Sequence, residues 1–267
     1  MPDLKTQGIK LHYETFGDAK APPVLMLAGL GGAGMTWGGQ VKRFAERYHV
    51  ILPDHRGTGQ SSRPAGGYTI AQHASDFAAL LRHLDTGPVH VVGSSTGGAI
   101  AQLMALDHGD LVRTITMTSS FARPNAYVRR EFAVRRYLVE KADLKTIYSA
   151  YALFLFATTY AARHPDVVQA WVDRAAAGRL ERQVSLKRID MVMAHDVVSR
   201  LGSIRHPACV VGGDHDLCTT LLLSEEVFHA IPGAEMNVIT GGGHMIHFEH
   251  EERYFNIVSE FIDRHRG

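Results

Sequence analysis

The chain has 267 residues, 45% of them hydrophobic, which is enough for one large domain or two small ones with a sizeable buried core. Its 28 Lys and Arg nearly balance its 27 Asp and Glu, so nothing in the charge indicates nucleic acid or an anionic membrane, and we expect a small-molecule substrate. No apolar run approaches the roughly 18 residues of a membrane span and the first residues lack a signal-peptide pattern, so we expect a cytoplasmic protein. The two cysteines, Cys209 and Cys218, match neither a disulfide framework nor a metal-binding pattern and are expected as reduced thiols.

Short runs rich in Val, Ile and Leu alternate with longer amphipathic stretches, a pattern typical of βα units in a largely parallel sheet. Residues 9–16 alternate in polarity and predict an antiparallel edge strand. The other predicted strands are 24–28, 49–53, 89–93, 112–118, 208–212 and 235–240. The predicted helices are 36–48, 70–84, 97–107, 224–231 and a C-terminal helix from about His247.

The alternation stops between about Phe121 and Leu201, where the residues have helical periodicity and no convincing strand. This predicts a helical cap at 121–201, inserted into a core domain made of 1–120 and 202–267. Positive side chains outnumber negative ones in this segment by 14 to 8, whereas the rest of the chain is net negative. Solvated helix faces explain the surplus most simply. Alternatively, one or two arginines point inward and pair with a substrate carboxylate, the candidates being Arg123, Arg129, Arg130, Arg135, Arg136 and Arg188.

The same segment contains an aromatic-rich stretch. Core packing of the cap is the simplest interpretation, and some of its rings are also expected to line an apolar substrate pocket. The aromatic residues are Tyr148, Tyr151, Phe154, Phe156 and Tyr160.

An apolar strand runs into the sequence Gly-Ser-Ser-Thr-Gly at 93–97, and a helix of small residues follows at once. This is the strand-turn-helix context that a Gly-x-Ser-x-Gly nucleophile elbow requires. The turn strains the serine backbone so that the hydroxyl projects, and side chains two positions away on either side would collide with strand and helix. The helix start also points main-chain N–H groups at a developing oxyanion. We therefore interpret Ser95 as a nucleophile, with an ordinary helix-capping serine as the alternative.

A serine hydroxyl is a weak nucleophile at neutral pH and needs a base, which in turn needs an orienting carboxylate. The loop after the predicted strand 208–212 offers Asp214 and Asp216, and the glycine-rich loop after the strand 235–240 offers His244. The chain order Ser, Asp, His is the one expected for α/β hydrolases. Position alone leaves both carboxylates open as the acid.

With these motifs the chain resembles the α/β-hydrolase family over essentially its whole length. Residues 54–61, Asp-His-Arg-Gly-Thr-Gly-Gln-Ser, are similar to the family's Asp-x-Arg-Gly-x-Gly-x-Ser turn. The sequence most resembles the small-cap branch that holds 3-oxoadipate enol-lactonases, aminoacrylate-type hydrolases, cofactor-free haloperoxidases and carbon-carbon bond hydrolases. The resemblance implies an α/β-hydrolase fold: a mostly parallel sheet of about eight strands, helices on both faces and an inserted helical cap.

The resemblance also implies roles for individual residues. The family's acid pattern, Gly-x-x-Asp-x-x-(Thr/Val)-Pro, falls on Gly213 and Asp216, with Thr219 at the threonine position and Thr220 in place of the proline. It therefore favours Asp216 over Asp214 as the acid.

For the oxyanion hole, the resemblance implies two main-chain donors. One is the N–H of Thr96, directly after the nucleophile, and the other is the N–H of Leu30 in the loop after the strand 24–28. Ala28 stands where the family usually has a histidine, but a main-chain donor does not depend on that side chain.

These features predict a serine hydrolase that cleaves an ester or lactone bond of a small molecule through Ser95, His244 and Asp216, with an acyl-enzyme and no metal or cofactor. Whether the substrate carries a carboxylate stays open. Activity should rise as the pH passes roughly 6 to 7, because His244 must be neutral to act as a base. The alternatives are a carbon-carbon bond hydrolase or cofactor-free haloperoxidase on the same fold, and a low-turnover ligand receptor.

Two other patterns offer different interpretations. Residues 29–34 read Gly-x-Gly-x-x-Gly, and Asp54 follows at the end of the next strand, which is a dinucleotide-binding fingerprint of NAD-dependent oxidoreductases. That interpretation leaves the Ser95 turn and the His244 loop unexplained, so we favour the interpretation of residues 29–34 as an oxyanion loop. His244, His247 and His250 recur every third residue, but their helical directions fan over about 120°, and we expect no metal site.

Overall fold

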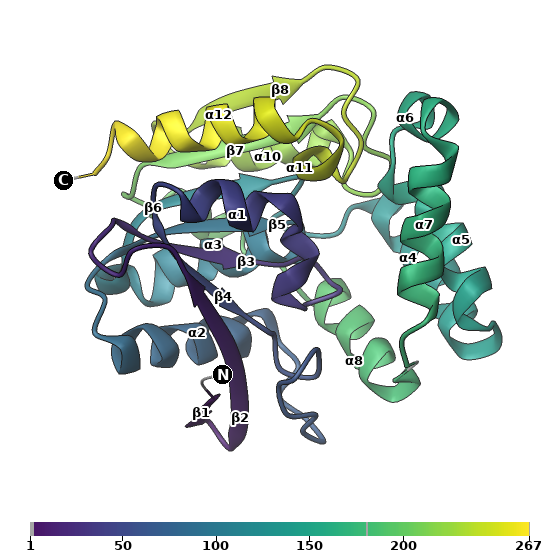
Figure 1. Ribbon diagram of the computed structural model, residues 1–267, viewed down its shortest axis with the longest axis horizontal. Coiled ribbons are helices and arrows are strands. Elements are labelled where there is room, and N and C mark those ends of the chain that lie inside the picture. The colour runs from purple at the N-terminus through teal and green to yellow at the C-terminus, as the bar shows by residue number, and fades with distance from the viewer. Residues whose placement is uncertain (1–2, 180, 267) are drawn as a thin grey trace.

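The computed structural model describes residues 3–179 and 181–266. Eight strands form one sheet in the order β1-β2-β4-β3-β5-β6-β7-β8 (Figure 1). Strands β3 to β8 pair in parallel, whereas β2 is antiparallel to both of its neighbours. The predicted α/β fold with a mostly parallel sheet is therefore confirmed. The strands are β1 (Asp3–Thr6), β2 (Ile9–Phe16), β3 (Pro23–Leu27), β4 (His49–Pro53), β5 (Val89–Ser94), β6 (Val112–Thr118), β7 (Ala208–Gly213) and β8 (Glu235–Ile239).

The N-terminal edge of the sheet differs from the prediction. β2 has the predicted bounds, but it is not the edge strand, because β1 pairs along its outer side. Gln7 and Gly8 form the turn between the two strands with φ of 50° and 72°, and positive φ at both positions suits a tight hairpin. β1 has four residues, only one of them apolar, and so gave no clear strand pattern.

Two predicted helices are interrupted. The helix predicted at 36–48 is a 3-10 turn, η1 (Gly34–Trp37), followed by α1 (Gly39–Ala45), because Gly38 between them has a φ of 54°. The C-terminal helix is α11 (Ile246–Glu249) followed by α12 (Glu251–Asp263), with His250 outside the helical conformation. The remaining elements of the core are α2 (Ile70–Leu84), α3 (Thr96–Asp107), η2 (Gly109–Leu111) and α10 (Leu221–Ala230), so the other predicted helices start within a few residues of the observed ones.

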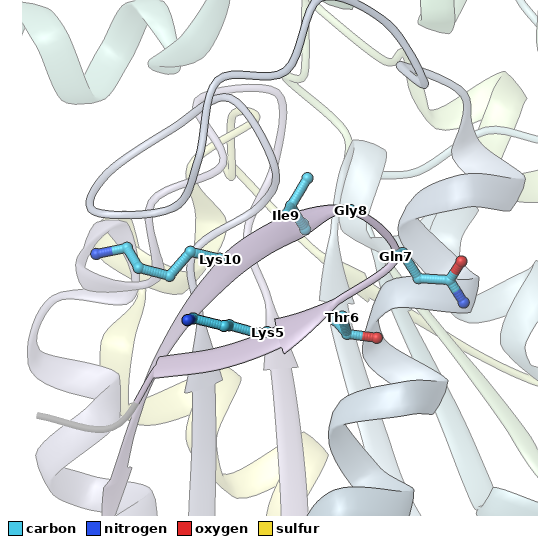
Figure 2. Close-up of a pocket in the computed structure, with 6 residues that line it drawn as sticks. All are labelled: Lys5, Thr6, Gln7, Gly8, Ile9 and Lys10. Carbon is cyan, nitrogen blue, oxygen red and sulfur yellow. The ribbon is translucent and has the colours of Figure 1, made fainter.

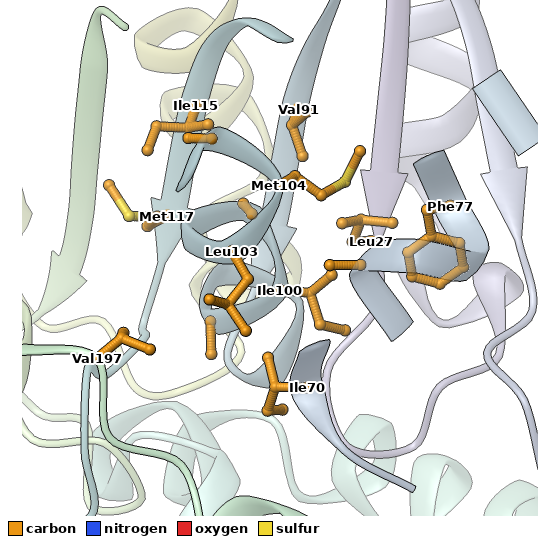
Figure 3. Close-up of a cluster of buried hydrophobic side chains, with 14 of the residues drawn as sticks. Leu27, Ile70, Phe77, Val91, Ile100, Leu103, Met104, Ile115, Met117 and Val197 are labelled. Carbon is orange, nitrogen blue, oxygen red and sulfur yellow. The ribbon is translucent and has the colours of Figure 1, made fainter. Parts of the chain in front are cut away.

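Helices pack on both faces of the sheet and bury a separate apolar cluster on each. On one face α3 packs against α2 and against β5 and β6, and Figure 3 shows Ile100, Leu103 and Met104 of α3 pointing into this cluster. Residues 96–105 of α3 are all buried, so the start of this helix, next to Ser95, is held firmly. No helix in the described part of the chain is both long and apolar enough to cross a membrane.

Between the end of β6 and the start of β7, the described residues form six helices, here called the inserted helices. Because they connect the carboxyl end of one parallel strand to the next strand, they begin at the edge of the sheet where Ser95 lies. In Figure 1, α4 to α7 form a separate group beside the sheet, and α8 lies below them. The inserted helices are α4 (Ala126–Lys141), α5 (Leu144–Leu155), α6 (Thr158–Arg163), α7 (Pro165–Ala176), α8 (Arg182–Met193) and α9 (Val198–Leu201).

Candidate active site

Ser95 lies in a strained turn at the carboxyl end of β5. It is the single residue between β5 and α3, and its φ of 53° and ψ of −117° are values that residues with side chains rarely adopt. A Cβ at Gly93 would lie 2.2 Å from the Gly97 carbonyl oxygen, and a Cβ at Gly97 would lie 2.1 Å from that of Leu27. Both glycines are therefore required sterically, as the nucleophile-elbow interpretation expects.

Asp216 and His244 meet in a buried hydrogen bond. The neighbouring parallel strands β7 and β8 bring their two loops to the same edge of the sheet. His244 Nδ1 lies 2.9 Å from Asp216 Oδ2, with 6% and 1% of the two side chains exposed. Asp216 Oδ1 accepts the main-chain N–H groups of Cys218 at 2.8 Å and Thr219 at 2.9 Å. These two bonds hold the carboxylate in place beside the imidazole.

Asp214 has different surroundings. It is exposed, and its Oδ1 accepts the main-chain N–H of Gly241 at 2.7 Å. Of the two carboxylates that position alone left open, Asp216 is the one bonded to His244.

A chain of hydrogen bonds runs from His244 to the Ser95 turn. Thr219 Oγ1 lies 3.1 Å from His244 Nδ1 and donates to the Ser119 carbonyl oxygen at 2.6 Å. The next residue, Ser120, donates its hydroxyl to the Ser95 carbonyl oxygen at 2.8 Å. Among residues 3–179 and 181–266, no hydrogen bond joins the Ser95 hydroxyl to the His244 ring. The structure thus joins His244 to Asp216 directly, and to Ser95 only through intervening residues.

The electrostatic surroundings of His244 favour its protonated form. Burial alone would lower the pKa of this imidazole, but the adjacent Asp216 carboxylate and the Cys218 side chain together outweigh burial and raise the pKa well above its usual value. His244 is therefore a stronger base than a free histidine. The pH at which activity is expected to rise is therefore higher than the range of roughly 6 to 7 that the sequence predicted.

The glycine-rich loop after β3 passes against Ser95. A Cβ at Gly29 would lie 3.4 Å from the Ser95 Cβ. Within the described ranges, the main-chain N–H groups of Leu30 and Thr96 donate to no protein acceptor. Free amides close to a serine hydroxyl are the arrangement that stabilises an oxyanion.

The 54–61 segment connects the loop after β3 to the loop after β4. Asp54 accepts the N–H of Gly34 on one carboxylate oxygen and that of Gln60 on the other, each at 2.8 Å. The dinucleotide fingerprint would need this carboxylate for a ribose hydroxyl, and here it is already used. Arg56 and Asp76 form a buried ion pair with two hydrogen bonds of 2.6 Å.

Helix α4 contacts the Asp216 loop along one face. Tyr127 donates to the Leu217 carbonyl oxygen at 2.6 Å, and Arg135 donates to the Cys218 sulfur at 3.2 Å. Glu131, between them on the same face, pairs with Arg135 at 2.6 Å, and both side chains are buried. Burial raises the pKa of Glu131, against the opposing charge of Arg135.

The six candidate arginines divide by burial. Arg123, Arg129, Arg130 and Arg136 lie at the surface, as solvated helix faces would predict. Arg135 and Arg188 point inward. Arg135 has the Glu131 carboxylate as its partner, whereas Arg188 donates to main-chain carbonyl oxygens.

The aromatic cluster of the inserted helices packs against the loop that carries His244. Phe156 contacts Phe248, with ring centroids 6.0 Å apart, and the Met245 N–H donates to the Leu155 carbonyl oxygen at 3.0 Å. Glu249 ties the same elements together, because its carboxylate accepts the N–H of Ala157 at 3.1 Å and that of Gly243 at 2.9 Å. No sequence motif singled out Glu249, since its partners are brought to it by the fold.

His247 has a packing role. Its ring lies 4.9 Å from the Trp37 ring and 6.0 Å from the Tyr254 ring, and burial lowers its pKa to about 3. A neutral histidine between aromatic rings fits a core position.

A surface hollow at the β1–β2 hairpin lies away from these residues. Figure 2 shows it lined by residues 5–10, among them Lys5 and Lys10. In the strand order β1 and β5 are separated by three other strands, so this hollow is not part of the Ser95 edge.

Comparisons with known proteins identify the family of the chain. The family model described as alpha/beta hydrolase fold matches residues 22–251. RutD of Azorhizobium caulinodans, named provisionally as a carbamate hydrolase, is 32% identical over 244 residues, 91% of each chain.

Two solved structures are similar over nearly the whole chain. The enol-lactonase from Burkholderia xenovorans LB400 has a TM-score of 0.89 and 25% identity, and the match covers 98% of this chain and all of that one. Est816, described as an N-acyl homoserine lactone degrading enzyme, has a TM-score of 0.83 and 28% identity, with 97% and 100% covered. On its family match and its fold, the chain belongs to the alpha/beta hydrolase family, and its relatives are hydrolases.

Proposed function

We propose that the protein is a serine hydrolase that cleaves an ester or lactone bond of a small molecule. The observation that carries the proposal is the buried Asp216–His244 hydrogen bond at the same sheet edge as the strained Ser95 turn. A buried carboxylate–imidazole pair at the same sheet edge as a strained serine turn is the arrangement that activates a serine.

In the proposed reaction the Ser95 oxygen attacks the substrate carbonyl carbon, and His244 takes the hydroxyl proton. Asp216 holds the imidazole in the tautomer that can accept it and stabilises the imidazolium. The N–H groups of Leu30 and Thr96 stabilise the negative charge that forms on the carbonyl oxygen. His244 then returns the proton to the leaving alkoxide. Water, deprotonated by His244, releases the acid and restores Ser95.

The relatives support the substrate class. Named activities among them are carbamate hydrolysis, enol-lactone hydrolysis and degradation of a homoserine lactone, all of which attack an acyl carbon bonded to a heteroatom. The inserted helices are proposed as the cap that selects the substrate, because their aromatic cluster packs on the His244 loop. The buried Arg135 and Arg188 do not need a substrate carboxylate as a partner, since each already bonds to the protein.

Ser95→Ala tests the proposal. Wild-type protein should react with a fluorophosphonate at Ser95 and hydrolyse a short p-nitrophenyl ester, and the variant should lose about 10⁴-fold or more in kcat with an unchanged fold. A panel of esters, lactones, carbamates and β-diketones would then separate acyl-oxygen from carbon-carbon cleavage. Turnover like that of the wild type by Ser95→Ala would reject the serine mechanism.

A further inference from the structure

Arg188, on the inserted helix α8, is a buried cation without an acidic partner. It is 3% exposed, and within the described ranges no carboxylate lies within 4.0 Å of its nitrogens. Burial lowers its pKa to about 10, so the guanidinium stays charged at neutral pH. Nearby His73 stays neutral, because burial lowers its pKa to about 3. A buried charge is costly unless its surroundings are arranged to accept it.

Main-chain carbonyl groups from two loops provide that arrangement. Arg188 Nε donates to the Leu30 carbonyl oxygen at 3.0 Å, Nη2 donates to the same oxygen, and Nη1 donates to the Arg56 carbonyl oxygen at 3.1 Å. Beside it, Lys187 donates to the Ala65 carbonyl oxygen at 2.6 Å. Figure 1 shows α8 next to the loop that follows β4. Arg188 therefore fastens an inserted helix to the loops after β3 and β4.

The Leu30 carbonyl belongs to the central peptide of a tight turn. The Gly32 N–H donates to the Gly29 carbonyl oxygen at 2.9 Å, which places Leu30 and Gly31 at the middle of the turn. The Leu30 N–H belongs to the preceding peptide, between Gly29 and Leu30. Gly29 and Gly31 have no side chains to restrict the loop on either side of Leu30, so the turn alone fixes the position of this residue only loosely. A Cβ at Gly32 would lie 2.5 Å from Arg188 Nη2, so the guanidinium fits closely against the loop.

From these contacts we infer that Arg188 is a positioning residue for the oxyanion hole: it holds the Leu30 turn so that the Leu30 N–H stays directed at the substrate carbonyl oxygen. The inference rests on the proposed function, in which that N–H is an oxyanion donor. Ala28, at the start of the loop, has only a methyl group and cannot hold the loop itself. The inserted helices thereby contribute to the rate as well as to substrate choice.

The test compares Arg188→Met with Arg182→Met. Arg182 is on the same helix and also donates to carbonyl oxygens, but its acceptors are Val139 in α4 and Ala142 directly after α4, and neither belongs to a loop of the sheet. With a short p-nitrophenyl ester, Arg188→Met should lower kcat about 10- to 100-fold with KM within about threefold, because a misplaced donor weakens binding of the transition state. The rate of fluorophosphonate labelling should fall by a similar factor. Arg182→Met should change both rates less than about twofold.

Arg188→Lys separates geometry from charge and serves if the methionine variant does not fold. A lysine keeps the charge but lacks the planar fork that spans two carbonyl groups, so kcat should still be reduced, at least several-fold. Wild-type kcat in a folded Arg188→Met or Arg188→Lys variant, or a change confined to KM, would overturn the inference. Absence of Ser95 labelling in the wild type would instead reject the proposed function itself, so the two failures are distinguishable.

Discussion

The loops at the carboxyl edge of the sheet and the inserted helices reach the same site by different physical means. At the edge, main-chain geometry fixes the groups: Ser95 is held by a turn that two glycines permit, and Asp216 by two main-chain N–H bonds. The inserted helices act through single side chains, such as Arg188, which cross to a core loop. The main chain around Ser95 leaves no space for an added atom at Gly93 or Gly97, whereas a contact made by one side chain can be weakened partially. Substitutions should therefore have severe effects at the edge and graded effects at the contacts with the inserted helices.

After Ser95→Ala, the largest effect is expected from Asp216→Asn. Loss of the carboxylate that orients His244 should lower kcat by about 10⁴-fold, the scale seen when the equivalent acid of a serine protease is replaced by an amide. Asp214→Asn is the matched control, because Asp214 is exposed and bonds Gly241 instead, and kcat should stay within about twofold. Equal losses in both variants would contradict the assignment of Asp216. Initial rates on the same ester give the comparison.

The pH profiles of the wild type and of Asp216→Asn sharpen this prediction. Asp216 raises the pKa of His244, and only the neutral imidazole accepts a proton, so wild-type activity should fall as the pH drops through a midpoint above 6.5. Without the carboxylate, burial lowers the pKa, and the remaining activity of Asp216→Asn should extend to lower pH. An acid limb that does not move would show that another group controls it.

Gly93→Ala should damage the edge through the main chain. The added Cβ would lie 2.2 Å from the Gly97 carbonyl oxygen and cannot be accommodated without shifting strand or helix, so the free energy of unfolding should fall by about 3 kcal/mol. In the control, Gly66→Ala, the Cβ meets nothing within 4 Å, and the change should stay within about 1 kcal/mol. Urea unfolding curves measure both values. Similar stabilities for the two variants would argue against a sterically closed turn.

Glu249→Gln should show the graded effect of a side-chain contact. The carboxylate accepts two N–H groups, from Ala157 and Gly243, whereas an amide can accept with one end only. Loss of about 1 kcal/mol of support for the His244 loop should lower kcat about fivefold. The control is Glu252→Gln, an exposed glutamate of α12, which should leave kcat unchanged. If both variants keep wild-type rates, Glu249 does not position His244.

The sequence by itself determined most of the parallel sheet, most helices and the Ser95 turn, and its resemblance to a known family implied the α/β-hydrolase fold. The sheet, the helices and the turn depend on local rules: apolar runs of strand length, or glycines that a strained turn requires. Prediction was wrong where local rules conflicted or were weak, as at Gly38, which splits a helix, and at the short polar strand β1.

Only the tertiary structure decided which side chains act together. Position left Asp214 and Asp216 both open as the acid and the family pattern favoured Asp216, but only the fold brings this carboxylate to His244, 28 residues away. Six arginines were candidates to point inward, and the fold buries two, one of which, Arg188, reaches the Leu30 carbonyl oxygen 158 residues away. Glu249 and Ala157 are 92 residues apart. Such contacts depend on how whole helices pack against the sheet, and no short stretch of sequence contains that information.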